Sequence, residues 1–148
     1  MLKCLFAAPI VFWASAAPAE GDLSRAIPQE IVIEMGKQDL THMYFKPNNI
    51  SLETGKAYKL VFKNTDNEKH EFSSPEGVAR IFTRKVQTLG PDGKMISEIK
   101  GSISEIEVAG GGVAEWFIVP VQTGEKIPIL CALEGHAEAG MVGTFTIK

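Results

Sequence analysis

Short runs in which apolar and polar residues alternate make up much of this 148-residue sequence. The clearest run places Tyr58, Leu60 and Phe62 at every second position. Because successive side chains of a β-strand point to opposite faces, this spacing predicts a strand with one buried face. Gly, Pro, Asn and Asp, which favour turns, separate the runs. The pattern predicts an all-β fold built as a β-sandwich.

The remaining runs give the other strands that we expect. They lie at residues 31–33, 43–45, 50–52, 70–72, 103–108, 114–119, 127–132 and 141–147. The Pro-Asn sequence within 46–49 would bend or divide an edge strand. Residues 74–102 interrupt the rhythm, and we interpret them as an insertion, a surface loop over one edge of the sandwich. The spacing of its side chains predicts a short helix involving Val78, Ile81, Phe82 and Lys85.

Residues 1–19 have the pattern of a secretory signal peptide. Lys3 supplies a positive charge, residues 5–16 form an apolar run, and Ala-Pro-Ala at 17–19 is a small-x-small cleavage pattern. We expect cleavage between Ala19 and Glu20, export to the periplasm, and one domain over residues 20–148. The apolar run is too short to span a bilayer, so no stable membrane insertion of the mature chain is expected.

The charge pattern excludes some partners. The formal net charge is -3, and the sequence has no basic stripe of the kind that binds nucleic acid. We therefore expect no binding of nucleic acid. We also expect a monomer that meets protein partners transiently.

Cleavage would remove Cys4 and leave Cys131 as the one cysteine of the mature chain. Exported proteins normally pair their thiols, so a lone thiol needs a reason. It can be a metal ligand, a catalytic nucleophile, half of an intermolecular disulfide or a small buried hydrophobe. A nucleophile is disfavoured because Cys131 follows an apolar strand, whereas reactive thiols are activated by a helix N-terminus or an imidazolium.

The residues that follow Cys131 favour a metal ligand. His136 and Met141 come next in order, so one loop presents a thiolate, an imidazole and a thioether. This soft donor set favours copper over magnesium or calcium. Glu134 and Glu138 are interpreted as solvated loop charges, although either of them in place of Met141 would give a red-copper or type 2 centre.

A second histidine is needed, and the sequence offers two. His70 lies at the end of a predicted strand, where a sandwich can bring distant segments together. His42 lies on an early strand and could be an ordinary half-exposed histidine. We favour His70.

These residues resemble the cupredoxin family, whose members pair an upstream histidine with a C-terminal Cys…His…Met loop. The spacing Cys131-x4-His136-x4-Met141 is similar to that of rusticyanin-like and auracyanin-like members. The resemblance implies a Greek-key β-sandwich with one mononuclear type 1 copper site, formed by His70, Cys131, His136 and Met141. Glu71 departs from the Asn or Ser found there in many members, yet its backbone N–H could still reach the Cys131 sulfur.

The resemblance also implies a function. Such a centre transfers single electrons through Cu(I)/Cu(II) cycling without binding a substrate, so we expect transient redox partners and no enzymatic activity. The alternative is copper tolerance or homeostasis, in which the protein sequesters or delivers copper to trafficking partners. The basic residues of the insertion, Arg80, Arg84 and Lys85, would suit a dedicated partner contact of that kind.

Overall fold

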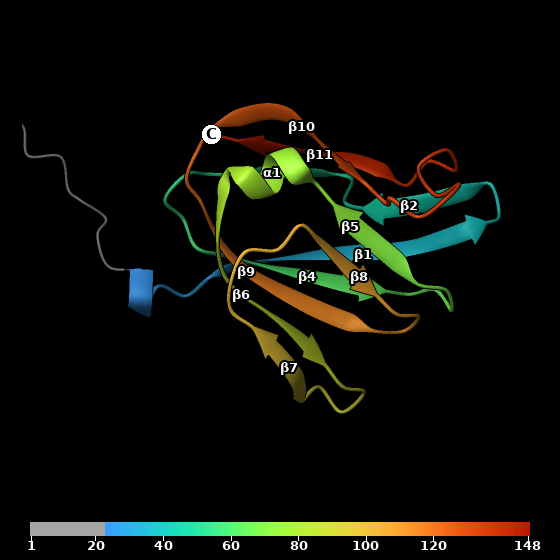
Figure 1. Ribbon diagram of the computed structural model, residues 1–148, viewed down its shortest axis with the longest axis horizontal. Coiled ribbons are helices and arrows are strands. Elements are labelled where there is room, and N and C mark those ends of the chain that lie inside the picture. Colours follow the sequence, from blue (N-terminus) through green and yellow to red (C-terminus); the bar gives the residue numbers. More distant parts are fainter. Residues whose placement is uncertain (1–22) are drawn as a thin grey trace, which may run out of the picture.

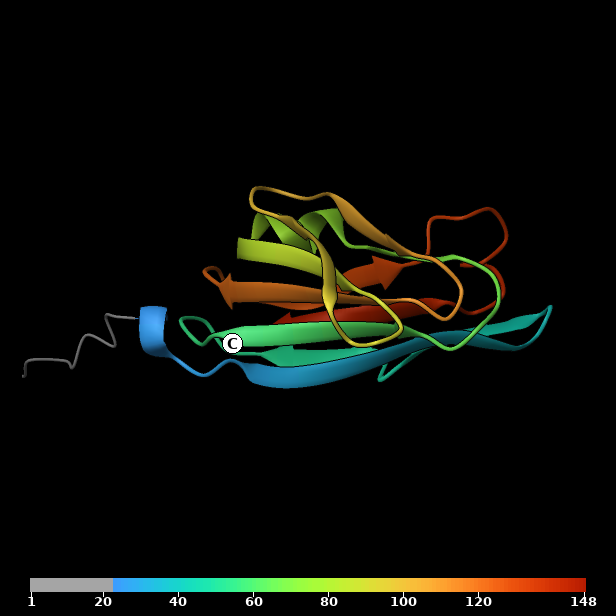
Figure 2. The same ribbon diagram turned by 90° about the horizontal axis from the view of Figure 1, so that it is seen from below.

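Two β-sheets pack face to face in the protein (Figures 1 and 2). The structure is a computed structural model that describes residues 23–148. In the described residues the first sheet has six strands, in the order β2 (His42–Lys46), β1 (Gln29–Asp39), β4 (Tyr58–Asn64), β9 (Val113–Pro120), β6 (Ile81–Leu89) and β7 (Met95–Ile99). The second has five, in the order β3 (Asn49–Leu52), β11 (Val142–Ile147), β10 (Gly124–Leu130), β5 (His70–Ser73) and β8 (Glu105–Val108). A 3-10 helix, η1 (Leu23–Arg25), and one short α-helix, α1 (Pro75–Ala79), complete the described part. The predicted all-β sandwich is confirmed.

The expected signal peptide, its cleavage site and Cys4 lie outside the described residues. Within residues 23–148 no helix combines the length and apolar character needed to cross a membrane. The Pro-Asn break falls where it was expected, because residues 47 and 48 separate β2 of the first sheet from β3 of the second.

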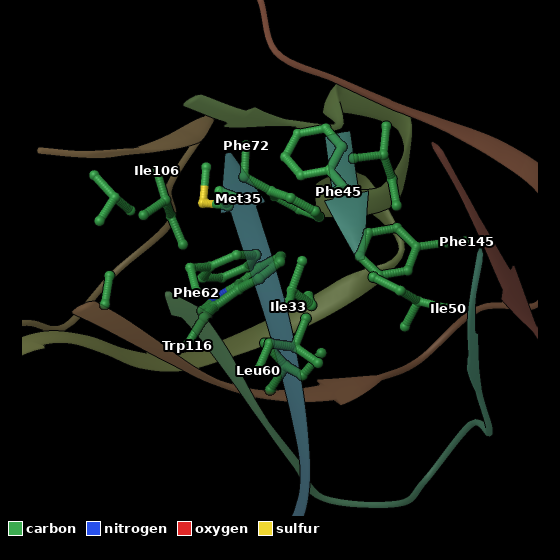
Figure 3. Packing of buried hydrophobic residues seen from close by; sticks show 14 of the residues in the cluster. Ile33, Met35, Phe45, Ile50, Leu60, Phe62, Phe72, Ile106, Trp116 and Phe145 are labelled. Carbon is green, nitrogen blue, oxygen red and sulfur yellow. The ribbon is translucent and has the colours of Figure 1, made fainter. Parts of the chain in front are cut away.

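The core lies between the sheets and is rich in aromatic rings (Figure 3). In β4, Tyr58, Leu60 and Phe62 are all buried, as their alternation predicted. Phe72 of the opposite sheet lies against Phe62, with ring centroids 4.5 Å apart. Its ring also meets Phe45 and Phe145, each at a centroid distance of 5.7 Å. Side chains from both sheets therefore interlock around Phe72.

The interpretation of residues 74–102 needs correction. The short helix exists, but it spans only Pro75–Ala79 and begins at proline, whose missing N–H costs nothing in the first turn. Residues 81–89 form β6, which pairs with β9 along its whole length and lies inside the six-stranded sheet. This segment is therefore part of the sandwich and not a lid over its edge.

A β-bulge explains why this strand was missed. The register of β6 against β9 shifts between Thr83 and Lys85, so one extra residue enters the strand there. Ile81 before the bulge and Val86 after it are both buried, five positions apart. That odd spacing breaks the period of two, so alternation does not reveal the strand. The edge strand β7 was missed for another reason, because all its residues are exposed and leave no alternation to detect.

Candidate metal centre

The loop from Cys131 to Met141 connects β10 to β11 and is held by its own backbone hydrogen bonds. The N–H of Cys131 donates to the carbonyl of Met141 at 3.1 Å, which ties the two ends together. Inside the loop, the N–H of Met141 donates to the carbonyl of His136 at 3.0 Å. Gly135 and Gly140 have φ values of +80° and +97°, which glycine adopts without strain. The loop therefore presents its side chains from a defined backbone.

His70 reaches this loop from the start of β5. Its Nδ1 lies 3.3 Å from Nδ1 of His136, and that atom of His136 lies 3.2 Å from Sγ of Cys131. The three donor atoms all lie within 4.8 Å of one another. Residues that are far apart in the sequence thus turn one sulfur and two ring nitrogens toward a common point.

Cys131 is fully buried at this point. Its Sγ accepts the backbone N–H of Glu71 at 3.3 Å, as the sequence suggested for that position. Burial nevertheless raises the pKa of the Cys131 thiol above its ordinary value, even though this N–H acts in the opposite direction. The metal-free protein therefore holds a protonated thiol at neutral pH, and metal binding there would release a proton.

His136 is less buried than the other two residues. Burial, followed by the repulsion from His70, lowers the pKa of His136 below its ordinary value. The imidazole is therefore neutral at neutral pH, which is the form that binds metals.

Met141 also belongs to this region. Its side chain is fully buried in the same hydrophobic core as Cys131. Its backbone carbonyl accepts the N–H of Cys131, and its own N–H donates to the carbonyl of His136. Glu134 and Glu138 are exposed, in keeping with solvated loop charges.

His42 does not join the cluster. Nδ1 of its exposed ring lies 2.9 Å from Oδ1 of Asp39. Hydrogen bonds to Asp39, first from Thr41 and then from His42, lower the pKa of Asp39 to about 2. Of the two histidines that the sequence offered, the fold brings His70 and not His42 to the cysteine.

One residue of the site was missed from the sequence. Oδ2 of Asp66 lies 3.1 Å from Nε2 of His70, while the other ring nitrogen, Nδ1, is the one that lies near His136. The side chain of Asp66 is only 6% exposed. The spacing Asp66-x3-His70 carries no signal of this contact in the sequence, because the two residues lie on either side of the end of a turn and meet only through its fold.

The donor set fits copper. A cysteine sulfur and two imidazole nitrogens are donors that suit copper in both oxidation states, and a buried thioether in the same loop suits a weak axial ligand. The burial of His70 and Cys131 also keeps water away from two of the donors. Hard cations such as calcium prefer oxygen ligands, which this cluster lacks.

Comparison with solved structures shows the same fold in copper enzymes. The chain is similar to a multicopper oxidase from Campylobacter jejuni, a metallo-oxidase, with a TM-score of 0.62, 16% identity, and coverage of 82% of this chain and 30% of that one. A copper-containing nitrite reductase from Thermus scotoductus gives a TM-score of 0.62, 14% identity, and coverage of 81% and 31%. A copper nitrite reductase from Nitrosomonas europaea gives a TM-score of 0.61 and 15% identity, and the match covers 84% of this chain and 52% of that one. The chain thus spans 30% to 52% of the length of these proteins.

These structures correct one expectation. We expected no enzymatic activity, yet the solved structures that share the fold include a metallo-oxidase and nitrite reductases. The expectation is wrong as an inference from this fold, because the same sandwich occurs within copper enzymes.

Comparison with curated proteins found no match. Among family models, that of the cupredoxin-like domain matches residues 4–101. The matched segment includes His70 and ends before Cys131, so the cysteine loop is supported by geometry and not by this match. The segment covers more than half of the 148 residues, and the sandwich agrees with it. The chain therefore belongs to the cupredoxin-like domain family.

Proposed function

We propose that this protein holds one copper ion in a type 1 site formed by His70, Cys131, His136 and Met141, and that it transfers single electrons. The observation that carries the proposal is the convergence of Sγ of Cys131 with one ring nitrogen of each histidine, all within 4.8 Å of one another. Met141 supplies the fourth ligand from the end of the same loop. Bound copper would supply a centre that changes between Cu(I) and Cu(II).

The protein holds the ligand side chains through contacts that do not depend on the charge of the centre. Glu71 donates its N–H to Cys131, Asp66 accepts from His70, and the Cys131–Met141 hydrogen bond closes the loop. Contacts of this kind resist movement of the ligands when the charge of the centre changes. A site that moves little between its two charge states is suited to fast electron transfer.

His136 is the point of electron exchange in this proposal. It is partly exposed, whereas His70 and Cys131 are fully buried. Leu133, Ala137 and Ala139 are half-buried in the same loop, so each leaves part of an apolar side chain exposed. A small apolar surface suits brief contacts with redox partners, because weak interfaces release their partners quickly.

The structure offers less support for copper homeostasis than the sequence did. That alternative depended on basic residues displayed by an insertion. Arg80 instead donates to the carbonyl of Thr123 at 2.8 Å and to Glu76 at 3.0 Å, and Lys85 pairs with Glu98 at 2.9 Å. Two of the three basic residues therefore stabilise the sandwich itself, and electron transfer is the function that we retain.

We further propose that the protein works as a monomer in the periplasm after export. The support is the signal-like pattern of residues 1–19. The full chain, expressed in a bacterial host, is expected to appear in the periplasmic fraction with Glu20 as its first residue. Mass spectrometry of the purified protein checks this expectation. Recovery of the uncleaved chain from the cytoplasm alone would contradict it.

Electrochemistry tests the function. The metal-free protein is titrated with copper(II) and studied by visible absorption and cyclic voltammetry. We expect one copper per chain, a strong thiolate-to-copper absorption band and a reversible one-electron wave. The reversible wave follows from ligands that move little between the two states. Colourless binding, or a wave that is irreversible at all scan rates, would overturn the proposal.

A further inference from the structure

Asp66 is a buried carboxylate that touches the candidate metal centre from outside its set of donors. Its side chain is 6% exposed, and its partner His70 is fully buried. Nζ of Lys37 lies 3.7 Å from Oδ1 of Asp66. The same ammonium group pairs more closely with Glu68, whose Oε1 lies 2.7 Å away. A buried carboxylate in such surroundings needs hydrogen bonds to remain charged.

The turn around Asp66 supplies those hydrogen bonds. Its Oδ1 accepts the backbone N–H groups of Asn67 and Glu68, and its own N–H donates to the Asn64 side chain at 2.9 Å. The amide of Asn64 also donates to the carbonyl of Val108 at 2.9 Å, which attaches the turn to β8. These hydrogen bonds hold the Asp66 carboxylate in one orientation, with its Oδ2 facing His70.

A neutral imidazole carries one ring proton, and its position decides which nitrogen can bind a metal. An ionised carboxylate only accepts hydrogen bonds, so the His70 nitrogen that faces Asp66 must carry the proton. That nitrogen is Nε2, at 3.1 Å. The unprotonated Nδ1 then faces His136 and Cys131.

We propose that Asp66 is a positioning residue that keeps the proton of His70 on Nε2 and turns the Nδ1 lone pair toward the Cys131–His136 pair. The role of this lone pair as a copper ligand rests on the proposed function. The protonation state itself is a property of the metal-free chain. Asp66 also places a negative charge next to the centre, which favours Cu(II) over Cu(I) and lowers the reduction potential.

The chain contains a matched control. It has three histidines, and exposed His42 pairs with Asp39 through Nδ1 at 2.9 Å. The two Asp–His pairs therefore use opposite ring nitrogens, one buried and one exposed. A change specific to the buried pair can be separated from any general effect of removing an aspartate.

Nitrogen-15 NMR of the metal-free protein tests the proposal. Long-range proton–nitrogen spectra distinguish the two neutral forms of each imidazole. We expect His70 to be protonated on Nε2 in the wild type and to lose that preference in Asp66→Ala. In Asp39→Ala the form of His70 should remain unchanged. Protonation of His70 on Nδ1 in the wild type, or the same Nε2 preference in Asp66→Ala, would overturn the proposal.

A second variant covers the case in which alanine disrupts the turn. Asp66→Asn keeps the shape of the side chain but has a single acceptor oxygen, which the backbone N–H groups of Asn67 and Glu68 would hold. Its amide NH2 would then face Nε2 of His70 as a donor, so we expect the ring proton to move to Nδ1 while the turn is kept. Retention of the Nε2 proton in this variant would contradict the proposed contact.

Copper measurements connect the proposal to function. In competition with a Cu(I) chelator, we expect Asp66→Ala to bind copper about 10–100-fold more weakly, as is typical when a partner of a metal ligand is removed. Asp66→Asn should raise the reduction potential, whereas Asp39→Ala should change neither property. If the wild type fails to bind copper, the proposed function falls, and the NMR result on the metal-free chain still decides the role of Asp66.

Discussion

Replacing Cys131 with serine is expected to abolish the thiolate-to-copper absorption band completely. The band requires a sulfur ligand, and Cys131 is the cysteine whose Sγ lies 3.2 Å from Nδ1 of His136. Serine has a similar shape but a hydroxyl group that stays protonated at neutral pH and is a poor ligand for copper. Copper affinity should fall by more than the roughly 10–100-fold expected from losing a residue that only supports a ligand. Visible absorption during copper(II) titration, with electron paramagnetic resonance, measures both effects.

His42→Ala is the matched control for that experiment. His42 is exposed and pairs with Asp39 away from the cluster, so its removal should leave the band and the affinity unchanged. Thermal unfolding of metal-free Cys131→Ser should show that the variant keeps its fold. Retention of the colour in Cys131→Ser, or its loss in His42→Ala, would show that the ligand set is wrong.

Truncating Phe72 to alanine is expected to cost about 3–5 kcal/mol of the free energy of unfolding. The Phe72 side chain is 2% exposed and lies against three other rings from both sheets. Removing it leaves a cavity between the sheets and forfeits its edge-on and tilted ring contacts. Urea unfolding of the metal-free protein measures the loss.

The effect should extend to the candidate metal centre. The strand that carries Phe72 and His70 pairs with β10 at a single residue pair, Leu130 with Ser73. Packing of Phe72 therefore contributes much of what holds His70 near Cys131, and copper affinity should fall together with stability. Phe82→Ala is the control, because Phe82 is 59% exposed and its truncation should change the free energy of unfolding by less than about 0.5 kcal/mol. Equal losses in the two variants would contradict this account of the core.

Much of the sandwich could be predicted because strand alternation is a local property. Tyr58, Leu60 and Phe62 show their burial in the sequence, since every second residue of a strand faces the same side. The same rule failed for β6, where the bulge at residues 83–85 inserts one residue and shifts the alternation. It also failed for β7, whose exposed residues have no buried face to reveal.

The candidate site, like the sandwich, could be predicted from the sequence only in part. The order and spacing of Cys131, His136 and Met141 could be seen in the sequence, because one loop carries all three side chains. The preference for His70 over His42 was an inference from its place at a strand end. The fold decided the matter by burying one imidazole beside the cysteine and leaving the other in solvent beside Asp39.

By itself, the sequence determined the class of fold and the chemistry of one loop, since both follow from residues that are close together along the chain. Only the tertiary structure decided which upstream side chains complete the site. The pairing of Asp66 with His70, like the N–H of Glu71 on the cysteine sulfur, exists because two packed sheets place separate turns within hydrogen-bond distance. Hydrogen bonds between buried groups depend on direction and distance in space, and neither can be read from spacing in the sequence.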